Sequence, residues 1–196
     1  MNHLVFDAES VGLHGEAFAV AAVVIDADSG EEIASMYAAC DSAKAQATPG
    51  DEIAARAWLA VNCLPHLPPP NRSTPGEIRD TFWHFMQLHA RRGQGVVWAD
   101  CGWPVEARFL IACAEDDMVN REWTGPYPLY EITTLEDMLG LGASRRLPDR
   151  QRALDLRRQP NELPEHNPLA DARYSARRLW HCLRRMRGLT SPPGDS

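Results

Sequence analysis

Two acidic residues, Asp7 and Glu9, stand one residue apart after an apolar run near the N-terminus, in the segment FDAESVGL. Alternate residues of a β-strand face the same side, so a strand that ends here projects both carboxylates together, with Val5 below them. Two carboxylates on one face repel each other and raise each other's pKa, and a divalent cation removes this conflict. Mg²⁺ and Mn²⁺ prefer carboxylate oxygens. The pair is a candidate metal site, although acids with this spacing also occur on solvated turns.

A second group of chemically active residues lies near the C-terminus, in the segment EHNPLADAR. Asn167 and Pro168 are residue types that begin helices, so we expect His166 in the preceding loop and Asp171 in the first turns. The positive end of the helix dipole favours the ionised form of Asp171. An imidazole beside a helix-anchored carboxylate can act as a general base next to a metal ligand. An ordinary surface helix start uses the same residue types and is the alternative.

The middle of the chain offers two further acids. Asp100 ends the apolar run VVWAD, and Glu106 follows six residues later in PVEARFL. Strand ends and helix starts are where open α/β sheets gather their ligands, which suits either residue.

Together, the three segments resemble the three exonuclease motifs of the DEDD superfamily of 3′–5′ exonucleases. FDAESVGL is similar to the family's D-x-E-T-x-G-L, and HNPLADAR is similar to its H-x-A-x-x-D-A, the spacing of the DEDDh branch. The resemblance covers roughly residues 3–187 and is closest to small stand-alone bacterial and phage-type exoribonucleases. The second motif departs from the family pattern, because Glu106 stands where an aspartate is usual. Either Glu106, which we favour slightly, or Asp100 fills that position.

The resemblance implies a ribonuclease H-like fold and a 3′–5′ exonuclease that releases nucleoside 5′-monophosphates from single-stranded RNA or DNA. It also implies two divalent cations, Mg²⁺ or Mn²⁺, with His166 taking the proton of the attacking water. Nothing in the sequence separates RNA from DNA, which differ at the 2′ hydroxyl. The implied metal ligands are carboxylates of Asp7, Glu9, Asp171 and either Glu106 or Asp100.

A terminal nucleotide must be held by flat side chains and by groups that reach its phosphates. The backbone of the turn after the first motif can approach the terminal sugar, tryptophans can stack on a base, and late arginines can contact phosphates. Large aromatics more often serve packing. The substrate-binding candidates are Ser10, Val11, Gly12, Leu13, Trp103 and Arg173, followed by Trp58, Arg145, Arg146, Arg177 and Arg178.

The elements that must position these residues follow from the hydrophobic pattern. Three antiparallel strands are predicted first, the second of them buried on both faces. The later strands are joined through helices, which favours an α/β fold with a central mixed five-stranded sheet and helices on both faces. The predicted strands cover 3–9, 17–26, 33–40, 95–100 and the start of 127–139, and the predicted helices cover 48–64, 76–93, 104–117, the end of 127–139 and 167–188.

The composition is that of an ordinary soluble globular protein, with 44% apolar and 24% charged residues in a chain of 196. We expect one exonuclease domain over residues 1–188 and a disordered tail over 189–196. No apolar run approaches the roughly 18 residues of a membrane span, and the N-terminus lacks a signal-peptide pattern. Five cysteines without a C-x-x-C pair argue against a disulfide framework or a zinc site and favour a reducing cytoplasm.

The net charge of −7 conceals a basic C-terminal region, because residues 145–187 hold 12 arginines and five acidic residues. Such a region can bind a polyanion, and it can equally be a solvated helix surface. The expected partner is a nucleic-acid 3′ end, without a membrane, and a homodimer is an option. Two other functions stay open: a catalytically impaired nucleic-acid-binding module of the same fold, and a metal hydrolase that cleaves a small phosphodiester.

Overall fold

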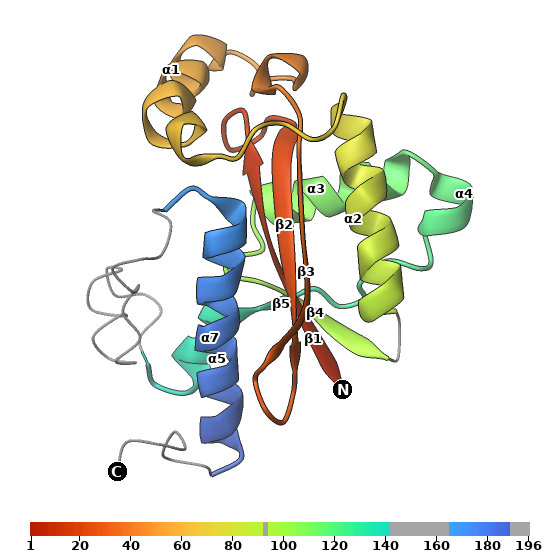
Figure 1. The fold of residues 1–196 in the computed structure, drawn as a ribbon, viewed down its shortest axis with the longest axis vertical. Coiled ribbons are helices and arrows are strands. Elements are labelled where there is room, and N and C mark those ends of the chain that lie inside the picture. Colours follow the sequence, from red (N-terminus) through yellow and green to blue (C-terminus); the bar gives the residue numbers. More distant parts are fainter. Residues whose placement is uncertain (92–93, 142–164, 189–196) are drawn as a thin grey trace.

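The computed structural model describes residues 1–91, 94–141 and 165–188 (Figure 1). The predicted tail over 189–196 and the loop arginines Arg145 and Arg146 lie outside the described residues. The strands are β1 (Asn2–Ser10), β2 (Ala17–Asp26), β3 (Glu32–Ala39), β4 (Gly95–Ala99) and β5 (Tyr130–Glu131). The helices are η1 (Ser42–Lys44), α1 (Glu52–Asn62), η2 (Leu64–His66), α2 (Pro75–His89), α3 (Val105–Glu115), α4 (Met118–Arg121), α5 (Ile132–Met138) and α7 (Pro168–Met186).

The strands form one mixed sheet in the order β3-β2-β1-β4-β5. β1 pairs antiparallel with β2, which pairs antiparallel with β3, whereas β4 runs parallel to both β1 and β5. This confirms the predicted α/β class and the mixed five-stranded sheet. β1 extends beyond its pairing with β4, which ends at Phe6 and Ala99. The last residues of β1 therefore project past the end of the neighbouring parallel strand.

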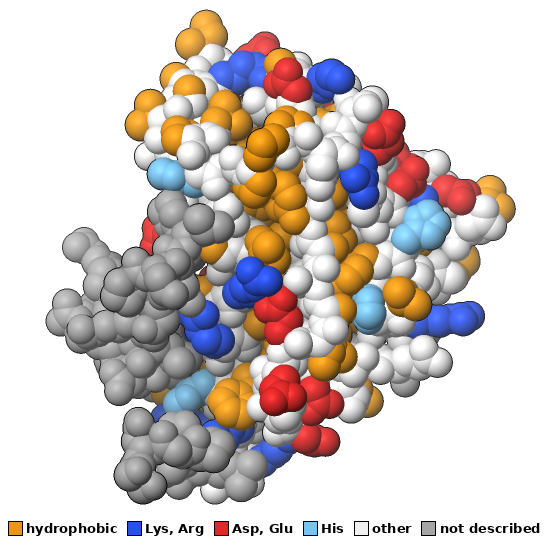
Figure 2. Space-filling view, viewed as in Figure 1, with side chains coloured by type: hydrophobic (Ala, Val, Ile, Leu, Met, Phe, Trp, Pro, Cys, Tyr) orange, Lys and Arg blue, Asp and Glu red, His pale blue; other side chains and the backbone are white. Residues whose placement is uncertain are grey.

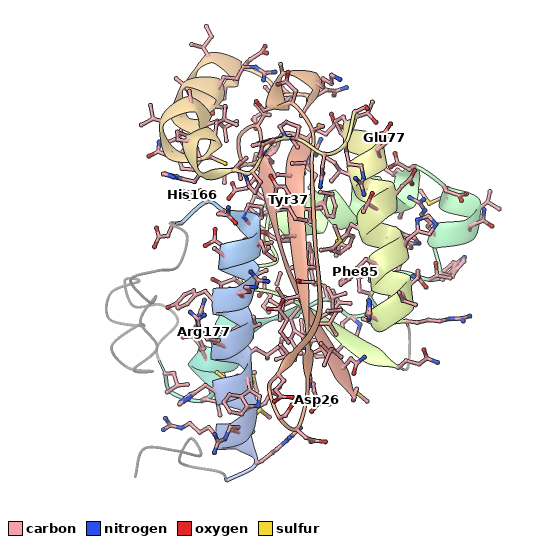
Figure 3. The ribbon with its side chains drawn as sticks, in the orientation of Figure 1. Asp26, Tyr37, Glu77, Phe85, His166 and Arg177 are labelled. Carbon is pink, nitrogen blue, oxygen red and sulfur yellow. The ribbon has the colours of Figure 1, made fainter. Side chains whose placement is uncertain are left out.

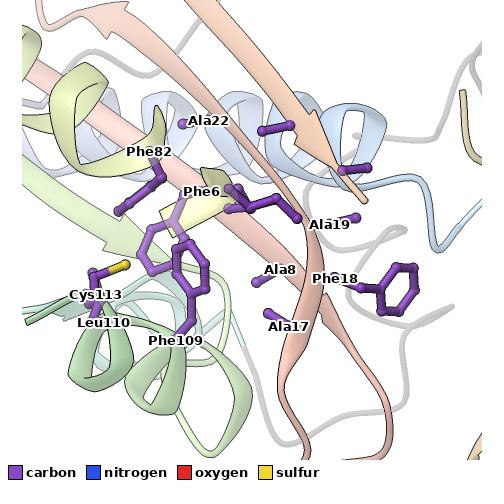
Figure 4. Packing of buried hydrophobic residues seen from close by; sticks show 14 of the residues in the cluster. Phe6, Ala8, Ala17, Phe18, Ala19, Ala22, Phe82, Phe109, Leu110 and Cys113 are labelled. Carbon is purple, nitrogen blue, oxygen red and sulfur yellow. The ribbon is translucent and has the colours of Figure 1, made fainter. Parts of the chain in front are cut away.

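Helices cover both faces of this sheet, as predicted. Leu4, Phe6 and Ala8 of β1 belong to the core that α2 and α3 cover, where the rings of Phe6, Phe82 and Phe109 meet (Figure 4). Val5 faces the other way and packs in the core formed with α5 and α7. Because alternate strand residues point to opposite faces, this register sends Asp7 and Glu9 toward the α7 side.

The element boundaries differ from the predicted ones mainly at helix ends. The helix predicted over 48–64 begins later, at Glu52, and the helix predicted over 76–93 spans Pro75–His89. The short helices η1, η2 and α4 are absent from the prediction, because one helical turn carries too little periodicity to be recognised. None of the described helices is long and apolar enough to span a membrane.

His3 leads us to predict a loss of stability in mild acid. Its imidazole is buried, and its Nδ1 accepts a hydrogen bond of 2.9 Å from the indole Nε1–H of Trp98. Burial, followed by the N-terminal ammonium group and Arg187, lowers the pKa of His3 from 6.5 to about 4. The folded state binds this proton less tightly than the unfolded chain, so stability is full above pH 6.5 and is lost as the pH falls toward 4. We expect His3 to remove about 2 kcal/mol of unfolding free energy between pH 8 and pH 5.

Urea unfolding at pH 8 and pH 5 measures this effect. His3→Gln offers Trp98 an acceptor that does not titrate, so the unfolding free energy of the parent relative to that of His3→Gln should fall by about 2 kcal/mol from pH 8 to pH 5. His84→Gln, at an exposed position, is the matched control and should keep the parent's pH dependence. An equal pH dependence in the parent and His3→Gln would contradict the assignment.

Candidate active site

Three carboxylates from opposite ends of the chain meet at the end of β1. One oxygen each from Asp7, Glu9 and Asp171 lie within 4.8 Å of one another. Asp7 and Glu9 share a face because they alternate along β1, and Asp171 comes from the first turn of α7. The start of α7 is fixed by Asn167, whose side chain accepts a hydrogen bond from the backbone N–H of Ala170. The structure thus brings together three acids that the sequence separates by more than 160 residues.

Burial and the proximity of other carboxylates raise the pKa values of Asp7 and Glu9. Burial, then Glu9 and then Asp171, raises the pKa of Asp7 well above its usual range. Burial, followed by Asp171 and Glu106, raises the pKa of Glu9 to about 8, although the nearby Cys63 thiol lowers it. Close carboxylates that resist ionisation are a donor set suited to a divalent cation, which favours their charged forms.

Glu106 approaches the same cluster from the opposite layer of the fold. It lies in the first turn of α3, where the backbone N–H groups of Glu106 itself and of Ala8 in β1 favour the ionised form of its carboxylate. Ala8 lies beyond the last residue of β1 that pairs with β4. Burial raises the pKa of Glu106 to about 7, although these two N–H groups lower it. Its charge in turn raises the pKa values of Asp7 and Glu9.

Asp100, the alternative to Glu106, is engaged by an arginine. Its Oδ2 accepts a hydrogen bond of 2.7 Å from Nη1 of Arg178, whose guanidinium also binds Glu136 through two bonds of 2.7 and 2.8 Å. Arg178 and Glu136 are both buried, with 2% and 1% of their surfaces exposed. Sequence reasoning assigned Arg178 to phosphate contact and did not notice Glu136. This is a correction: burial against Glu136 withdraws the guanidinium of Arg178 from the surface.

His166 lies between α1 and the start of α7, next to the acid cluster (Figure 3). Its Nδ1 is 3.8 Å from Oε1 of Glu9, and its side chain is 39% exposed. The backbone of His166 has φ 65°, the left-handed region that non-glycine residues seldom adopt. The imidazole is therefore held at the edge of the cluster, where water reaches it.

Residues of α1 and η2 touch the His166 loop, and sequence reasoning missed most of these contacts. The rings of Trp58 and His166 meet edge to face at 4.8 Å between centroids. The Cys63 thiol donates to the backbone carbonyl of His166 at 3.6 Å, and the side-chain amide of Asn167 donates to the carbonyl of His66 at 2.8 Å. The sequence carries no signal for these contacts, because they join residues about 100 positions apart.

The turn after β1 is compact. Val11 is fully buried, and its carbonyl accepts a hydrogen bond from the backbone N–H of Thr48. Ser10 closes the turn by donating to the carbonyl of Gly12, which has φ 82°. A Cβ on Gly12 would lie 2.6 Å from Oγ1 of Thr48, so both conformation and space require glycine. Leu13 alone of the four predicted turn residues is largely exposed, at 65%.

The other substrate-binding candidates differ in whether their side chains are exposed or already paired. Trp103 is 71% exposed and borders a cavity of about 480 Å³ together with His14 and Arg108. Arg173 makes two hydrogen bonds of 2.9 Å to Glu32. On the face shown in Figure 2, described basic side chains alternate with acidic ones.

No protein-family model and no curated protein sequence matches the chain. Several solved structures match its fold. Exonuclease I from Methylocaldum szegediense matches with a TM-score of 0.64 and 13% identity, over 95% of this chain and 43% of the exonuclease. Exonuclease X, solved with 5′-overhanging duplex DNA, matches with a TM-score of 0.54 and 18% identity, over 96% of this chain and 94% of its own.

A third match is the nuclease domain of 3′hExo, a DEDDh family member solved bound to rAMP. It has a TM-score of 0.62 and 12% identity, over 95% of this chain and 92% of that domain. The sheet order, the helices on both faces and the match over nearly the whole chain agree with one another. The chain therefore has the ribonuclease H-like fold of the DEDDh 3′-exonucleases.

Proposed function

We propose that the protein is a metal-dependent 3′–5′ exonuclease of the DEDDh type. It hydrolyses the terminal phosphodiester bond of single-stranded RNA or DNA and releases nucleoside 5′-monophosphates. The observation that carries this proposal is the meeting of Asp7, Glu9 and Asp171 beside His166. The shared fold supports it, since exonuclease X and 3′hExo were solved with DNA and with rAMP. We further propose that residues 1–188 form one exonuclease domain.

The residues at the site fit divalent cations. Three carboxylate oxygens within 4.8 Å, with Glu106 close enough to raise the pKa of Glu9, form an all-oxygen donor set of the kind Mg²⁺ and Mn²⁺ prefer. When bound, two such cations supply Lewis acidity to the attacking water and to the departing 3′ oxygen. The proposed ligands are Asp7, Glu9, Glu106 and Asp171. Asp100 is left out because its carboxylate binds Arg178.

The chain's own groups perform the remaining tasks. His166, with its ring partly exposed beside Glu9, accepts the proton of the attacking water. The backbone of Ser10 to Leu13 follows Glu9 directly in the chain, and we propose that it contacts the terminal sugar. Leu13 and Trp103, both largely exposed, offer apolar surface to the bases. Arg173 reaches a phosphate only by giving up its pairing with Glu32, so we rank it below these groups.

Five cysteines that are all free thiols support a reducing cytoplasm as the compartment. A homodimer stays a prediction from the resemblance.

End-labelled oligonucleotides test the proposed function directly. We expect stepwise shortening of 5′-labelled RNA or DNA from the 3′ end with Mg²⁺ or Mn²⁺, and none with EDTA. Parallel RNA and DNA series of the same sequence measure the preference between the sugars. Binding without shortening would instead indicate a nucleic-acid-binding module, and cleavage of small diesters alone would indicate a different metal hydrolase.

The acid cluster also predicts that cation binding stabilises the protein more at higher pH. The folded-state pKa values of Glu9 and Glu106 are raised to about 8 and about 7, so these groups oppose folding as the pH rises above their unfolded value of 4.5. In EDTA, we expect the melting temperature to fall between pH 6 and pH 9. Mg²⁺ or Mn²⁺ should remove most of that fall, because a bound cation favours the ionised carboxylates and binds only the folded state.

Differential scanning fluorimetry across this pH range measures the effect, with KCl at matched ionic strength as the control for screening. Equal slopes of melting temperature against pH in EDTA and in Mn²⁺ would contradict cation binding at the cluster.

A further inference from the structure

The loop that carries His166 is held from outside its own element. His166 precedes Asn167, the N-cap of α7, so the hydrogen bonds of that helix do not fix the backbone of His166. Its left-handed backbone, φ 65°, persists only where surrounding contacts determine it. Apart from the approach of the imidazole to Glu9, the described contacts to this loop come from the segment from Trp58 to His66, about 100 residues earlier in the chain.

Cys63, the residue that joins α1 to η2, lies against the His166 loop and near Glu9. Its thiol donates to the carbonyl oxygen of His166, with Sγ 3.6 Å from that oxygen. The carboxylate of Glu9 lies close enough to act on the thiol electrostatically. Cys63 therefore binds the backbone of the proposed general base beside a proposed metal ligand.

The chemistry of Cys63 suits this task and little else. The residue is 0% exposed, so reagents and substrate do not reach it. Burial, then the charge of Glu9, raises the pKa of its thiol far above the usual range, so it stays a neutral donor. A buried thiolate beside three carboxylates would be repelled by them, which excludes a nucleophilic role.

Two neighbouring contacts hold the same loop. The ring of Trp58 packs edge-on against the imidazole of His166. Asn167, fully buried, donates to the carbonyl of His66 while its own side-chain oxygen caps α7. The imidazole, its backbone carbonyl and the following residue are therefore all fixed by the segment from Trp58 to His66.

We propose that Cys63 is a positioning residue, whose thiol holds the backbone of His166 beside Glu9 for the reaction. The inference rests on the proposed function and deepens it, because it names a residue that the DEDDh motifs do not contain. Groups that orient metal ligands and catalytic bases without touching substrate typically contribute about ten- to hundredfold to activity or metal affinity.

The test compares a variant without the donor, a variant with it and a distant control. Cys63→Ala removes the thiol, and Cys63→Ser keeps a donor at the same place. Cys113→Ala truncates another fully buried cysteine, which lies in α3 and has its Sγ 4.0 Å from the carbonyl of Arg79, away from the acid cluster. If Cys63→Ala does not fold, Cys63→Val, which fills the space without a donor, takes its place.

Two readouts separate positioning from stability. For Cys63→Ala we expect kcat on a single-stranded oligonucleotide to fall about tenfold with little change in KM, since the thiol does not touch substrate. Isothermal titration calorimetry without substrate should show Mn²⁺ binding weakened about tenfold, because the loop that Cys63 holds leads directly into the turn of α7 that carries Asp171. Cys63→Ser should restore most of the parent's kcat and most of its Mn²⁺ affinity. Cys113→Ala should keep the parent's kcat and Mn²⁺ affinity even where its melting temperature falls.

Unchanged kcat and Mn²⁺ affinity in folded Cys63→Ala, beside an active parent, would overturn the inference. The inference also fails if Cys63→Ser is as impaired as Cys63→Ala, since a lost donor would then not explain the defect. A parent protein that cleaves neither RNA nor DNA would overturn the proposed function instead, and the calorimetric comparison would still report whether Cys63 positions the loop that leads to Asp171.

Discussion

Asp7→Ala is expected to abolish exonucleolytic shortening of a 5′-labelled oligonucleotide and to leave the fold intact. Burial raises the pKa of Asp7 most, and the charges of Glu9, Asp171, Glu106 and Asp100 raise it further. Losing it removes a proposed metal ligand, and the charge stabilisation that a metal ion supplies is worth several kcal/mol. Because each 1.4 kcal/mol is a factor of ten in rate, we expect a fall of about 10³-fold or more.

The same substitution should raise the stability of the metal-free protein. A carboxyl whose folded-state pKa is raised opposes folding at every pH above its unfolded value of 3.8, and alanine removes that opposition. In EDTA at pH 8 we therefore expect Asp7→Ala to unfold at a higher urea concentration than the parent. In Mn²⁺ the difference in urea midpoint between the two proteins should shrink or change sign, because only the parent retains all of the proposed metal ligands.

Steady-state cleavage rates and urea midpoints, both with and without Mn²⁺, measure these effects. Asp28→Ala is the matched control, since Asp28 is 86% exposed in its side chain and lies in the turn between β2 and β3. It should change neither quantity appreciably. An Asp7→Ala protein that keeps most of its activity would contradict the assignment of Asp7 as a metal ligand.

Glu106→Gln and Asp100→Asn should separate into a loss of activity and a loss of stability. Glu106 contacts the backbone N–H of Ala8 and acts on Glu9 electrostatically, so Glu106→Gln should lower the cleavage rate about a hundredfold or more while the fold persists. Asp100 instead binds the buried guanidinium of Arg178. Asp100→Asn leaves Arg178 paired with Glu136 alone, which should cost about 1 kcal/mol, because Asp100 is about one-third exposed.

Parallel cleavage assays and urea unfolding of both variants make the comparison. Glu136→Gln is the control for the buried pair, since it disturbs Arg178 without touching the acid cluster, and it should destabilise the protein more than Asp100→Asn does. A larger loss of activity in Asp100→Asn than in Glu106→Gln would exchange the roles we propose for the two acids.

Local features of the sequence were sufficient to predict many of the strands and helices of this molecule. The apolar run 17–26 predicts a strand buried on both faces, and all of its residues except the last are buried in β2. Asn167 and Pro168 predict the start of the last helix, which begins at Pro168 with Asn167 as its cap. Strand alternation places Asp7 and Glu9 on one face. These predictions succeed because caps, alternation and apolar runs depend on residues a few positions apart.

Our proposal of Glu106 over Asp100 as a metal ligand draws on the tertiary structure. Asp100 pairs with Arg178, 78 positions later, and Arg178 in turn pairs with Glu136, 42 positions away. No local sequence pattern indicates the ion pair between Glu136 and Arg178, because it forms only when α5 and α7 pack together. The same packing buries an arginine that the sequence alone assigns to the surface.

What the sequence determined by itself was the chemical inventory and its order: two strand acids, a middle acid and a histidine five residues before a helix aspartate. What only the tertiary structure decided was which side chains are already engaged, and that Cys63 lies between Glu9 and His166, 103 residues from the latter. The physical reason is how far apart in the sequence the interacting residues lie. Backbone conformation follows largely from neighbours in the chain, whereas hydrogen bonds and ion pairs between distant elements exist only once the core has packed.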